Sequence, residues 1–239
     1  MKKQDIETVV GKLLDVFYVR RIAKLSGLKL RDALKRKNPY LFRAIGMHSA
    51  TEIVEGLLKA YMSSSDEGIF GDAFFEPLAK AVSKGSVAPS EGVDIIIETE
   101  NTYKAIAVKS GPSVFNAQSR RRQNQDFLAL RSRMIKLQKQ FDPIVGYCYG
   151  NKKSKPSESV SFRELAGQSF WEELTGDSEF YLKIIDAMRE RPAKHRQEFI
   201  VEWNKAINRF TRDFIAEYCL PDGTIDWHKF TKMNCGKTS

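Results

Sequence analysis

The stretch Gly92-Val93-Asp94-Ile95-Ile96-Ile97-Glu98, followed by Tyr103-Lys104-Ala105-Ile106-Ala107-Val108-Lys109-Ser110-Gly111, decides the fold because it predicts a β-hairpin. Both runs are rich in Ile and Val, and their residues alternate with period 2, as in strands with one buried face. Thr99-Glu100-Asn101-Thr102 separates the two runs and predicts a tight turn. The strands are therefore expected to pair antiparallel, and the register of pairing decides which polar groups meet.

The register of this hairpin brings polar side chains to one place. With the turn centred on its two middle residues, Glu98 lies opposite Tyr103 and Asp94 lies opposite Ala107. Directly opposed residues have Cβ atoms about 4.5–5.5 Å apart, so Asp94, Ala107 and Lys109 are expected to cluster on one face. The other face takes the aliphatic residues Val93, Ile95, Ile97, Ile106 and Val108. A slip of one residue would bury Asp94 and expose these aliphatic side chains, so the hydrophobic pattern holds the register.

Two carboxylates across such a hairpin can share a divalent cation, with a nearby Lys holding a water beside it. Asp94, a gap, and then a triplet that ends in Lys109 resemble the PD-(D/E)XK nuclease superfamily. The resemblance implies that Asp94 and position 107 bind Mg²⁺ or Mn²⁺, with the carbonyl of Val108 as a further ligand, and that Lys109 assists the attacking water. Pro89 lies upstream of Asp94 but not beside it, so this half of the motif departs from the pattern.

A longer pattern begins at Lys109-Ser110-Gly111-Pro112. It continues with Asn116, Arg120-Arg121-Arg122-Gln123-Asn124-Gln125, Phe141-Asp142-Pro143, Gly146-Tyr147-Cys148-Tyr149-Gly150, Phe162-Arg163-Glu164-Leu165-Ala166-Gly167-Gln168, Phe170-Trp171 and Leu174-Thr175-Gly176. These residues resemble a family of prokaryotic type II restriction endonucleases, the PmeII-like family. The resemblance implies an α/β fold with a restriction-endonuclease-like core, in which helices flank a mixed β-sheet and further helices are added at both ends. It also implies Mg²⁺-dependent, sequence-specific hydrolysis of double-stranded DNA by a homodimer, with a companion DNA methyltransferase.

Ala107 departs from the superfamily pattern, which has Glu or Asp at this position. Three explanations stay open. Ala107 is an engineered Glu-to-Ala change that impairs catalysis, or a natural small residue whose missing acid comes from a helix, or the mark of an inactive relative that only binds DNA.

A substitute acid must come from outside the hairpin. Glu98 lies about 13 Å from Asp94 along an extended strand, so it cannot take the place of an acid at position 107. The helical candidates are Asp126, Glu55 and Glu76. Glu76 is the preferred match, because a Glu from a preceding helix often completes the metal site in the resembled superfamily. Pro77 restricts the backbone of Glu76 and predicts a kink there.

Basic residues concentrate between Lys104 and Lys139, beside the predicted metal site. The whole chain has a net charge of +9, but this segment alone has nine basic residues and one acid, a local charge of +8. Binding to a phosphate backbone needs such a concentration, although a solvated helix face also explains it. The residues predicted to contact DNA are Ser110, Asn116, Arg120, Arg121, Arg122, Gln123, Asn124, Lys152 and Lys153. Base readout by Gln123 and Asn124 is left open, since ordinary helix polar residues look the same.

The rest of the chain predicts helices around this core. Residues 1–62 are expected to be an N-terminal helical region, residues 63–175 the nuclease core, and residues 176–239 a C-terminal helical region packed on it in one compact domain. Residues 63–66 are expected to cap a helix that runs to about residue 84, and residues 85–92 to form a loop. An amphipathic helix is predicted over residues 115–140, with a core stripe of Phe127, Leu130, Met134, Leu137 and Phe141. A strand is predicted at 143–149, an exposed basic loop at 151–159, and helices at 168–175, 180–188 and 195–218. The end after Pro221 is expected to be loosely packed, with Trp227 and Phe230 as anchors.

The sequence gives no support for several other kinds of protein. Cys148, Cys219 and Cys235 lack metal-ligand spacing, so neither a zinc site nor a disulfide framework is indicated. The sequence has no Gly-rich phosphate loop, which argues against a nucleotide-driven enzyme. It has no long apolar run or signal peptide, so a cytoplasmic protein without a membrane partner is expected. The rival functions are a non-cleaving DNA-binding protein with a nuclease-like fold and a structure-specific DNA repair nuclease.

Overall fold

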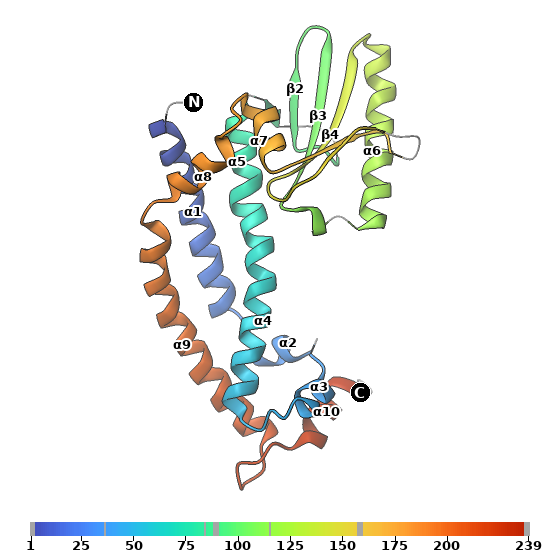
Figure 1. Ribbon diagram of the computed structural model, residues 1–239. Helices are drawn as coiled ribbons and strands as arrows, with labels where there is room; N and C mark the ends of the chain where they lie inside the picture. Colours follow the sequence, from blue (N-terminus) through green and yellow to red (C-terminus); the bar gives the residue numbers. More distant parts are fainter. Residues whose placement is uncertain are drawn as a thin grey trace. The chain divides into compact units, whose positions relative to one another are not determined.

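The computed structural model describes residues 3–35, 37–83, 85–87, 91–114, 116–156 and 160–236 (Figure 1). The helices are α1 (Lys3–Ser26), α2 (Leu30–Leu34), α3 (Pro39–Ala44), α4 (Ala50–Phe70), the π-helix η1 (Gly71–Phe75), α5 (Glu76–Val82), the 3-10 turn η2 (Pro112–Val114), α6 (Ala117–Lys136), α7 (Gln168–Thr175), α8 (Phe180–Met188), α9 (Arg191–Tyr218) and α10 (Trp227–Cys235). The strands are β1 (Ser86–Val87), β2 (Ile95–Glu98), β3 (Thr102–Lys109), β4 (Gln140–Tyr147), β5 (Lys153–Ser154) and β6 (Arg163–Ala166). Pro89 and residue 115 lie outside the described residues. Among the helices described, none combines the length and the apolar character needed to cross a membrane.

The chain divides into two compact units. We call Met1–Phe17 with Gly68–Arg191 the sheet unit, and Tyr18–Glu67 with Pro192–Ser239 the helical unit. The boundaries fall inside the helices α1 and α4 and at the start of α9, whereas the sequence suggested divisions after residues 62 and 175. A helix keeps the same period of 3.6 residues where it leaves one unit and enters another, so the hydrophobic pattern does not mark such a boundary.

Within the residues that the structure describes, the sheet has six strands in the order β1-β2-β3-β4-β6-β5. The predicted hairpin is confirmed as the antiparallel pair β2–β3, with Glu98 opposite Tyr103. Strand β4 pairs in parallel with both β3 and β6, so the strand expected after Asp142 lies inside the sheet as predicted. Strand β5 pairs antiparallel with β6 at the edge. The fold is therefore α/β with a mixed sheet, which confirms the predicted class.

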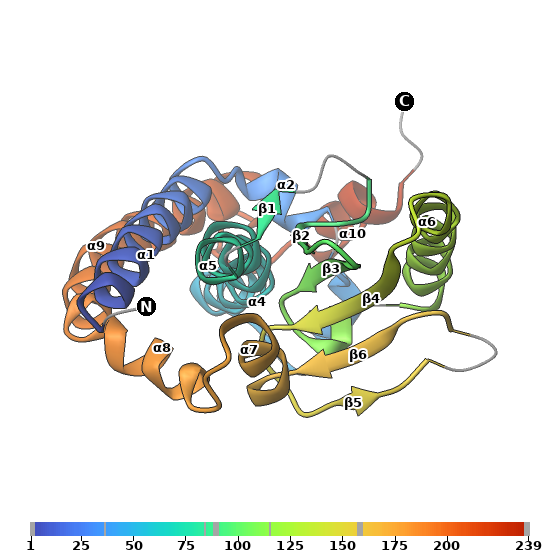
Figure 2. The same cartoon turned by 90° about the horizontal axis from the view of Figure 1, so that it is seen from above.

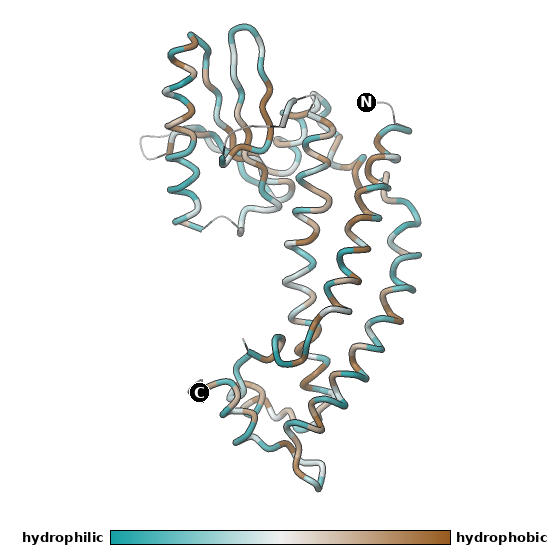
Figure 3. The backbone as a smooth tube through the Cα atoms, turned by 180° about the vertical axis from the view of Figure 1, so that it is seen from behind, coloured by the Kyte–Doolittle hydropathy of each residue, from teal (hydrophilic) through white to brown (hydrophobic). Residues whose placement is uncertain are grey.

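Helices cover both faces of the sheet (Figure 2). On one face, Phe127, Leu130 and Met134 of α6 pack in a buried cluster with residues of β2, β3 and β4. Figure 3 shows how hydrophobic and hydrophilic positions alternate along α6. On the other face lie α5, which contacts β3, and α7. A Cβ on Gly146 would overlap the ring of Phe170 from α7, so glycine lets α7 approach β4 closely.

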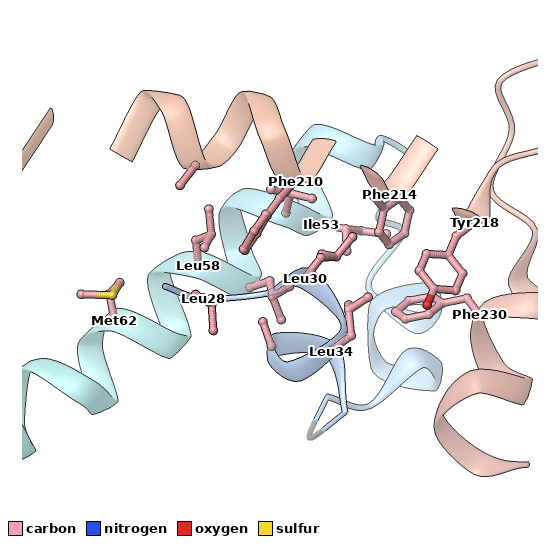
Figure 4. Close-up of a cluster of buried hydrophobic side chains, with 14 of the residues drawn as sticks. Leu28, Leu30, Leu34, Ile53, Leu58, Met62, Phe210, Phe214, Tyr218 and Phe230 are labelled. Carbon is pink, nitrogen blue, oxygen red and sulfur yellow. The ribbon is translucent and has the colours of Figure 1, made fainter. Parts of the chain in front are cut away.

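The helical unit has a hydrophobic core of its own (Figure 4). Its members come from α4, α9, α10 and the segment around α2, and those labelled in the figure are Leu28, Leu30, Leu34, Ile53, Leu58, Met62, Phe210, Phe214, Tyr218 and Phe230. The prediction of loose packing after Pro221 is wrong, but the anchors expected there, Trp227 and Phe230, do pack on this core. This segment forms α10, whose first turn is capped by the Asp226 carboxylate accepting from the amide of Lys229 at 2.9 Å, and Phe230 is fully buried.

Several smaller predictions are also wrong. Residues 63–66 do not open a new helix but lie inside α4, where Asp66 pairs with Arg21 at 2.9 Å. Leu137 follows the last residue of α6 and is 60% exposed, so it leaves the expected core stripe. Strands β1 and β5 lie in segments predicted to be loops, and β6 was not predicted. Two of these strands have only two residues, too few for a periodic pattern, and their pairing partners define them.

Candidate active site

A β-bulge sets Asp94 apart from the strand that follows it. The β2–β3 ladder ends at the pair Ile95–Ile106. An unbroken ladder would next pair Asp94 with Ala107, but the Asp94 amide donates instead to the carbonyl of Ile106 at 2.9 Å. Bulges of this kind turn the affected side chain in a new direction. Here the Asp94 carboxylate accepts a hydrogen bond from the amide of Val108 at 2.7 Å, and the Val108 peptide is thereby fixed beside the carboxylate.

Asp94 lies within electrostatic range of three other charged side chains. Burial raises the pKa of Asp94, and the negative charge of Glu76 raises it further, while the Val108 amide, Lys109 and Lys80 act in the opposite direction. The net effect is a pKa above the ordinary value of an aspartate. Lys80 also forms an ion pair with Glu76, with 2.6 Å between Nζ and Oε1. The structure thus gathers two carboxylates and two ammonium groups in the sheet unit.

The helix that carries Glu76 contains a π-helical segment immediately before it. The backbone stays helical from Phe70 through η1 into α5, and Pro77 cannot donate a hydrogen bond to the carbonyl four residues earlier. A π turn carries one extra residue and shifts the phase of everything that follows. Gly71 in η1 lies against Ser110, whose Oγ a Cβ on Gly71 would overlap, so the glycine lets this helix lie against the end of β3. The kink predicted at Glu76 is not found there, since Glu76 has helical backbone angles of φ −65° and ψ −47°; the irregular segment is the π-helix that precedes it.

Ala107 lies in an apolar environment. It is fully buried and belongs to the cluster that α6 covers, together with Phe127, Val145 and Tyr147. Val93 belongs to the same cluster, so the prediction that Val93 and Ala107 occupy opposite faces is wrong. The reason is the bulge at Asp94, which interrupts the alternation of side chains on which that prediction depended.

The residues predicted to contact DNA at the start of α6 have different surroundings. Arg121 and Arg122 are exposed, and Arg122 forms an ion pair with Glu91. Gln123 is buried and donates from Nε2 to the carbonyl of Gly92 at 2.6 Å. The Asn124 side-chain oxygen accepts from the amide and the hydroxyl of Ser161, at 2.8 and 2.7 Å. Asn116 caps α6 by accepting from the amide of Ser119 at 2.8 Å. Of these residues, Arg121 and Arg122 face solvent, whereas Gln123 and Asn124 connect α6 to neighbouring segments.

Arg120 and Lys152 both contact Glu164, a residue for which the sequence predicted no role in the site. Both form ion pairs with Glu164 of β6, at 2.6 and 2.8 Å, while Lys153 in β5 is exposed. The sequence contains no local signal for this cluster, because its members come from α6, the β4–β5 connection and β6. Lys80 was also missed, although its position four residues after Glu76 is the spacing of a helical ion pair and would have revealed it.

The donor set in this region suits a hard cation. Asp94 and Glu76 provide oxygen ligands, which Mg²⁺ prefers, and Mg²⁺ usually keeps several waters and needs only one or two carboxylates. The raised pKa of Asp94 beside a second acid marks a place where positive charge is favourable. In the part of the chain that the structure describes, no group of three or more His, Cys, Asp or Glu residues is arranged to hold a metal ion.

Comparison with known proteins gives one family. A family model described as type II restriction endonuclease EcoO109I matches residues 4–197. No curated protein matches the chain. The match includes Asp94, Glu76, Lys109 and the whole of α6.

Proposed function

Because the chain belongs to the family of the type II restriction endonuclease EcoO109I, we propose that Asp94, Glu76 and Lys109 form its Mg²⁺-dependent phosphodiesterase site. Membership places the protein among the type II restriction endonucleases and implies that it binds DNA. The proposal adds the position of the site, the metal and the roles of the residues. The observation that carries it is the convergence of Asp94 and Glu76 with two lysines at the β-bulge.

Asp94 and Glu76 would hold the metal ion. When bound, Mg²⁺ supplies Lewis acidity, which lowers the pKa of water for attack and offsets the charge that develops on phosphate. The negative charge of Glu76 contributes to the raised pKa of Asp94, and the two carboxylates together would favour a bound cation. The hydrogen bond from the Val108 amide fixes the Asp94 carboxylate, so its orientation is set before metal binds. The carbonyl of Val108 is proposed as a further ligand.

Lys109 would act on the phosphodiester and the attacking water. It is the last residue of β3 and lies close enough to Asp94 to lower the pKa of that carboxylate. From that position its ammonium group can donate hydrogen bonds to a water or to a phosphate oxygen, which orients the water and stabilises charge in the transition state. Lys80 holds the Glu76 carboxylate through their 2.6 Å ion pair and so limits its rotamers.

In this arrangement the second acid comes from a helix and not from β3. The PD-(D/E)XK superfamily pattern expects it at position 107, where this chain has a buried alanine. Glu76 takes over the role in the proposal, which makes Ala107 a natural residue of a working site. This favours the second of the three explanations for Ala107. The PmeII-like resemblance and the companion methyltransferase stay predictions. Hydrolysis of both strands of a palindromic site would suit a symmetric homodimer.

Plasmid digestion combined with metal titration tests the proposal. The chain as it stands is expected to cut plasmid DNA into discrete fragments when Mg²⁺ is present, and Asp94→Asn, Glu76→Gln and Lys109→Ala are expected to lose at least about 100-fold in rate. The affinity for Mn²⁺, measured by calorimetry without DNA, should be lower in Asp94→Asn and Glu76→Gln than in the parent chain. Asp72→Asn is the matched control, because Asp72 is an exposed acid on the same helical segment, four residues before Glu76. Normal cleavage by Lys109→Ala or Glu76→Gln would refute the assignment.

Ala107 also favours a second candidate, a family member that binds DNA without cutting it. In that case the chain would retain duplexes in a binding assay yet leave plasmid intact with Mg²⁺ or Mn²⁺. Cutting restricted to branches or ends would instead indicate a structure-specific repair nuclease. The digest separates the three outcomes directly.

A further inference from the structure

Glu164 is a nearly fully buried acid that collects polar groups from four segments of the sheet unit. Its side chain is 2% exposed. Arg120 binds it in a bidentate manner, from Nη1 to Oε1 at 2.7 Å and from Nη2 to Oε2 at 2.6 Å. Lys152 lies 2.8 Å from Oε1, the hydroxyl of Tyr147 donates to Oε1 at 2.8 Å, and the hydroxyl of Ser154 lies 3.1 Å from Oε2. We call Arg120, Lys152 and Glu164 the Glu164 cluster.

The Glu164 cluster keeps a surplus positive charge at the protein surface. Burial by itself raises the pKa of Glu164, but the hydrogen bonds from Arg120, Lys152 and Tyr147 outweigh it and bring the pKa to about 2. The acid is therefore ionised at neutral pH, and one anion faces two cations. The side chains of Arg120 and Lys152 are still 31% and 36% exposed, although the acid that holds them is enclosed.

Stability is a weak explanation for such a cluster. A buried ion pair contributes little net stability compared with well-packed apolar residues of the same volume, because both charges must lose their hydration. The cluster does fix the conformations of two long, flexible side chains. Freezing such side chains ahead of binding removes about 0.5–1.5 kcal/mol of ordering cost for each one at an interface. The expected benefit therefore lies in binding an external anion.

The position of the cluster points to the same kind of ligand. Strands β3, β4 and β6 run parallel, and Lys109 ends β3. Arg120 lies in the first turn of α6, the helix that follows β3 after a short connection. Ligands of α/β folds bind at the carboxyl ends of parallel strands, and the N-terminal turn of a helix adds positive potential for phosphate. Glu164 lies opposite Val145, two residues before Tyr147 and Lys109 pair at the carboxyl ends of β4 and β3, so the cluster lies near that end of the sheet.

We propose that Glu164 is a positioning residue that holds Arg120 and Lys152 as a clamp for one phosphate of the DNA backbone. The proposal rests on the proposed function, since it takes DNA as the ligand. In the part of the chain that the structure describes, Arg120 uses two of its five donors on Glu164, which leaves the others for a phosphate oxygen. Lys152 adds a second charge from the β4–β5 connection, so that a single phosphate is held from two sides.

The salt dependence of DNA binding tests the clamp. The probe is a short mixed-sequence duplex, and binding is followed by fluorescence anisotropy with Ca²⁺ in place of Mg²⁺ to prevent cutting. Log K falls as log salt rises, and losing one phosphate contact makes this slope shallower by about 0.9. A lower slope below means a shallower one. Arg120→Ala with Lys152→Ala is expected to lower the slope by about 0.9 and not by twice that amount, because both side chains hold one phosphate. Glu164→Gln, which removes only the carboxylate charge, is expected to lower it similarly and to weaken binding roughly tenfold at moderate salt.

Glu173→Gln is the matched control. Glu173 likewise holds two cations, Lys104 and Arg163, and its side chain is 20% exposed. This variant should bind the duplex as the parent does, with an unchanged slope. Thermal unfolding of each variant shows whether the protein is folded. If Glu164→Gln fails to fold, the Arg120→Ala and Lys152→Ala variants decide the result, because their side chains reach the surface.

The opposite outcome has a clear signature. If Glu164 only neutralises Arg120 and Lys152, its replacement by Gln frees two cations, and DNA binding becomes tighter with a steeper slope. That result, or unchanged slopes in Arg120→Ala and Lys152→Ala, would overturn the clamp and leave the proposed function untouched. Absence of DNA binding by the parent chain would instead count against the proposed function itself.

Discussion

Replacing Ala107 by Glu restores the acid that the superfamily pattern expects, and it discriminates between the explanations for this position. The structure predicts that the change damages the protein and does not activate it. Ala107 is fully buried, and its neighbours in the cluster include Phe127, Val145 and Tyr147. A longer side chain overpacks this region at a cost of about 1–3 kcal/mol, and an unpaired buried carboxylate adds several kcal/mol.

The combined cost is large compared with the stability of a typical domain. A loss of roughly 4 kcal/mol lowers Tm by on the order of 8–16 °C for a protein of this size, out of a total stability of about 5–15 kcal/mol. Because protonation removes the charge, the loss should shrink as the pH falls from neutral toward 5. Differential scanning calorimetry over this pH range, with and without Mg²⁺, gives both quantities. Plasmid digestion at a temperature below the lowered Tm gives the activity, which should not exceed that of the parent.

Ala105→Glu is the control for burial alone. Ala105 is fully buried in the same cluster and lies two residues earlier on the same face of β3. If position 107 is simply part of the core, Tm falls by a similar amount in the two variants, and Mg²⁺ raises it in neither. If instead Ala107→Glu folds normally, is stabilised by Mg²⁺ and cuts faster while Ala105→Glu does not, then Ala107 is a gap in a metal site and the role given to Glu76 is wrong.

Three further changes test other parts of the structure. Asp94→Asn keeps an acceptor for the Val108 amide. Because burial raises the pKa of Asp94 in the folded state, the stability that this group contributes is present below that pKa and is lost as the pH rises through it. The Asn variant should therefore show an equal or higher Tm at neutral pH without metal, and a clear drop in Tm would contradict the reasoning. Gly146→Ala should cost about 1–3 kcal/mol in urea unfolding by overpacking against Phe170, and adding Phe170→Leu should recover part of this loss; a cost that Phe170→Leu leaves unchanged would place the strain elsewhere. Gln123→Leu leaves the carbonyl of Gly92 without its donor and should lower the free energy of unfolding by about 1–3 kcal/mol. The salt slope of DNA binding should not change, and a lower slope would show that Gln123 contacts DNA.

The hairpin was predictable because its signal is local and repeated. Apolar residues recur on both sides of the turn, and the pair Glu98–Tyr103 follows from the turn alone; the predicted register holds from Ile95 to Glu98. The helices at Gln168–Thr175 and Phe180–Met188 were predictable for the same reason, since each has an apolar stripe of helical period. Strand β5 has two residues and no pattern of its own. Its existence depends on β6 lying beside it, which no local rule contains.

The residues of the candidate site were easier to predict from the sequence than the way in which they are arranged. Asp94, Lys109 and Glu76 were named from residue type and motif, yet the expected facing pair of Asp94 and Ala107 is not formed, because a bulge interrupts the register one residue before β2. Glu164 could not be identified at all. Its partners Arg120 and Lys152 lie 44 and 12 positions away in the chain, and only the parallel pairing of β4 and β6 brings the segments together.

Two irregularities, the β-bulge at Asp94 and the π-helical segment η1, explain how Asp94 and Glu76 come within reach of each other. A regular strand would send the Asp94 side chain toward position 107, and a regular α-helix through residues 71–75 would rotate Glu76 by about 100° from the direction that it has after a π turn. Each irregularity adds one residue to its element and redirects one carboxylate. Both are costly relative to regular structure, and both adjoin charged groups whose mutual repulsion also opposes folding. Elements that accumulate such costs at one place are expected where a ligand offsets them, which agrees with the proposal that Asp94 and Glu76 hold a divalent cation.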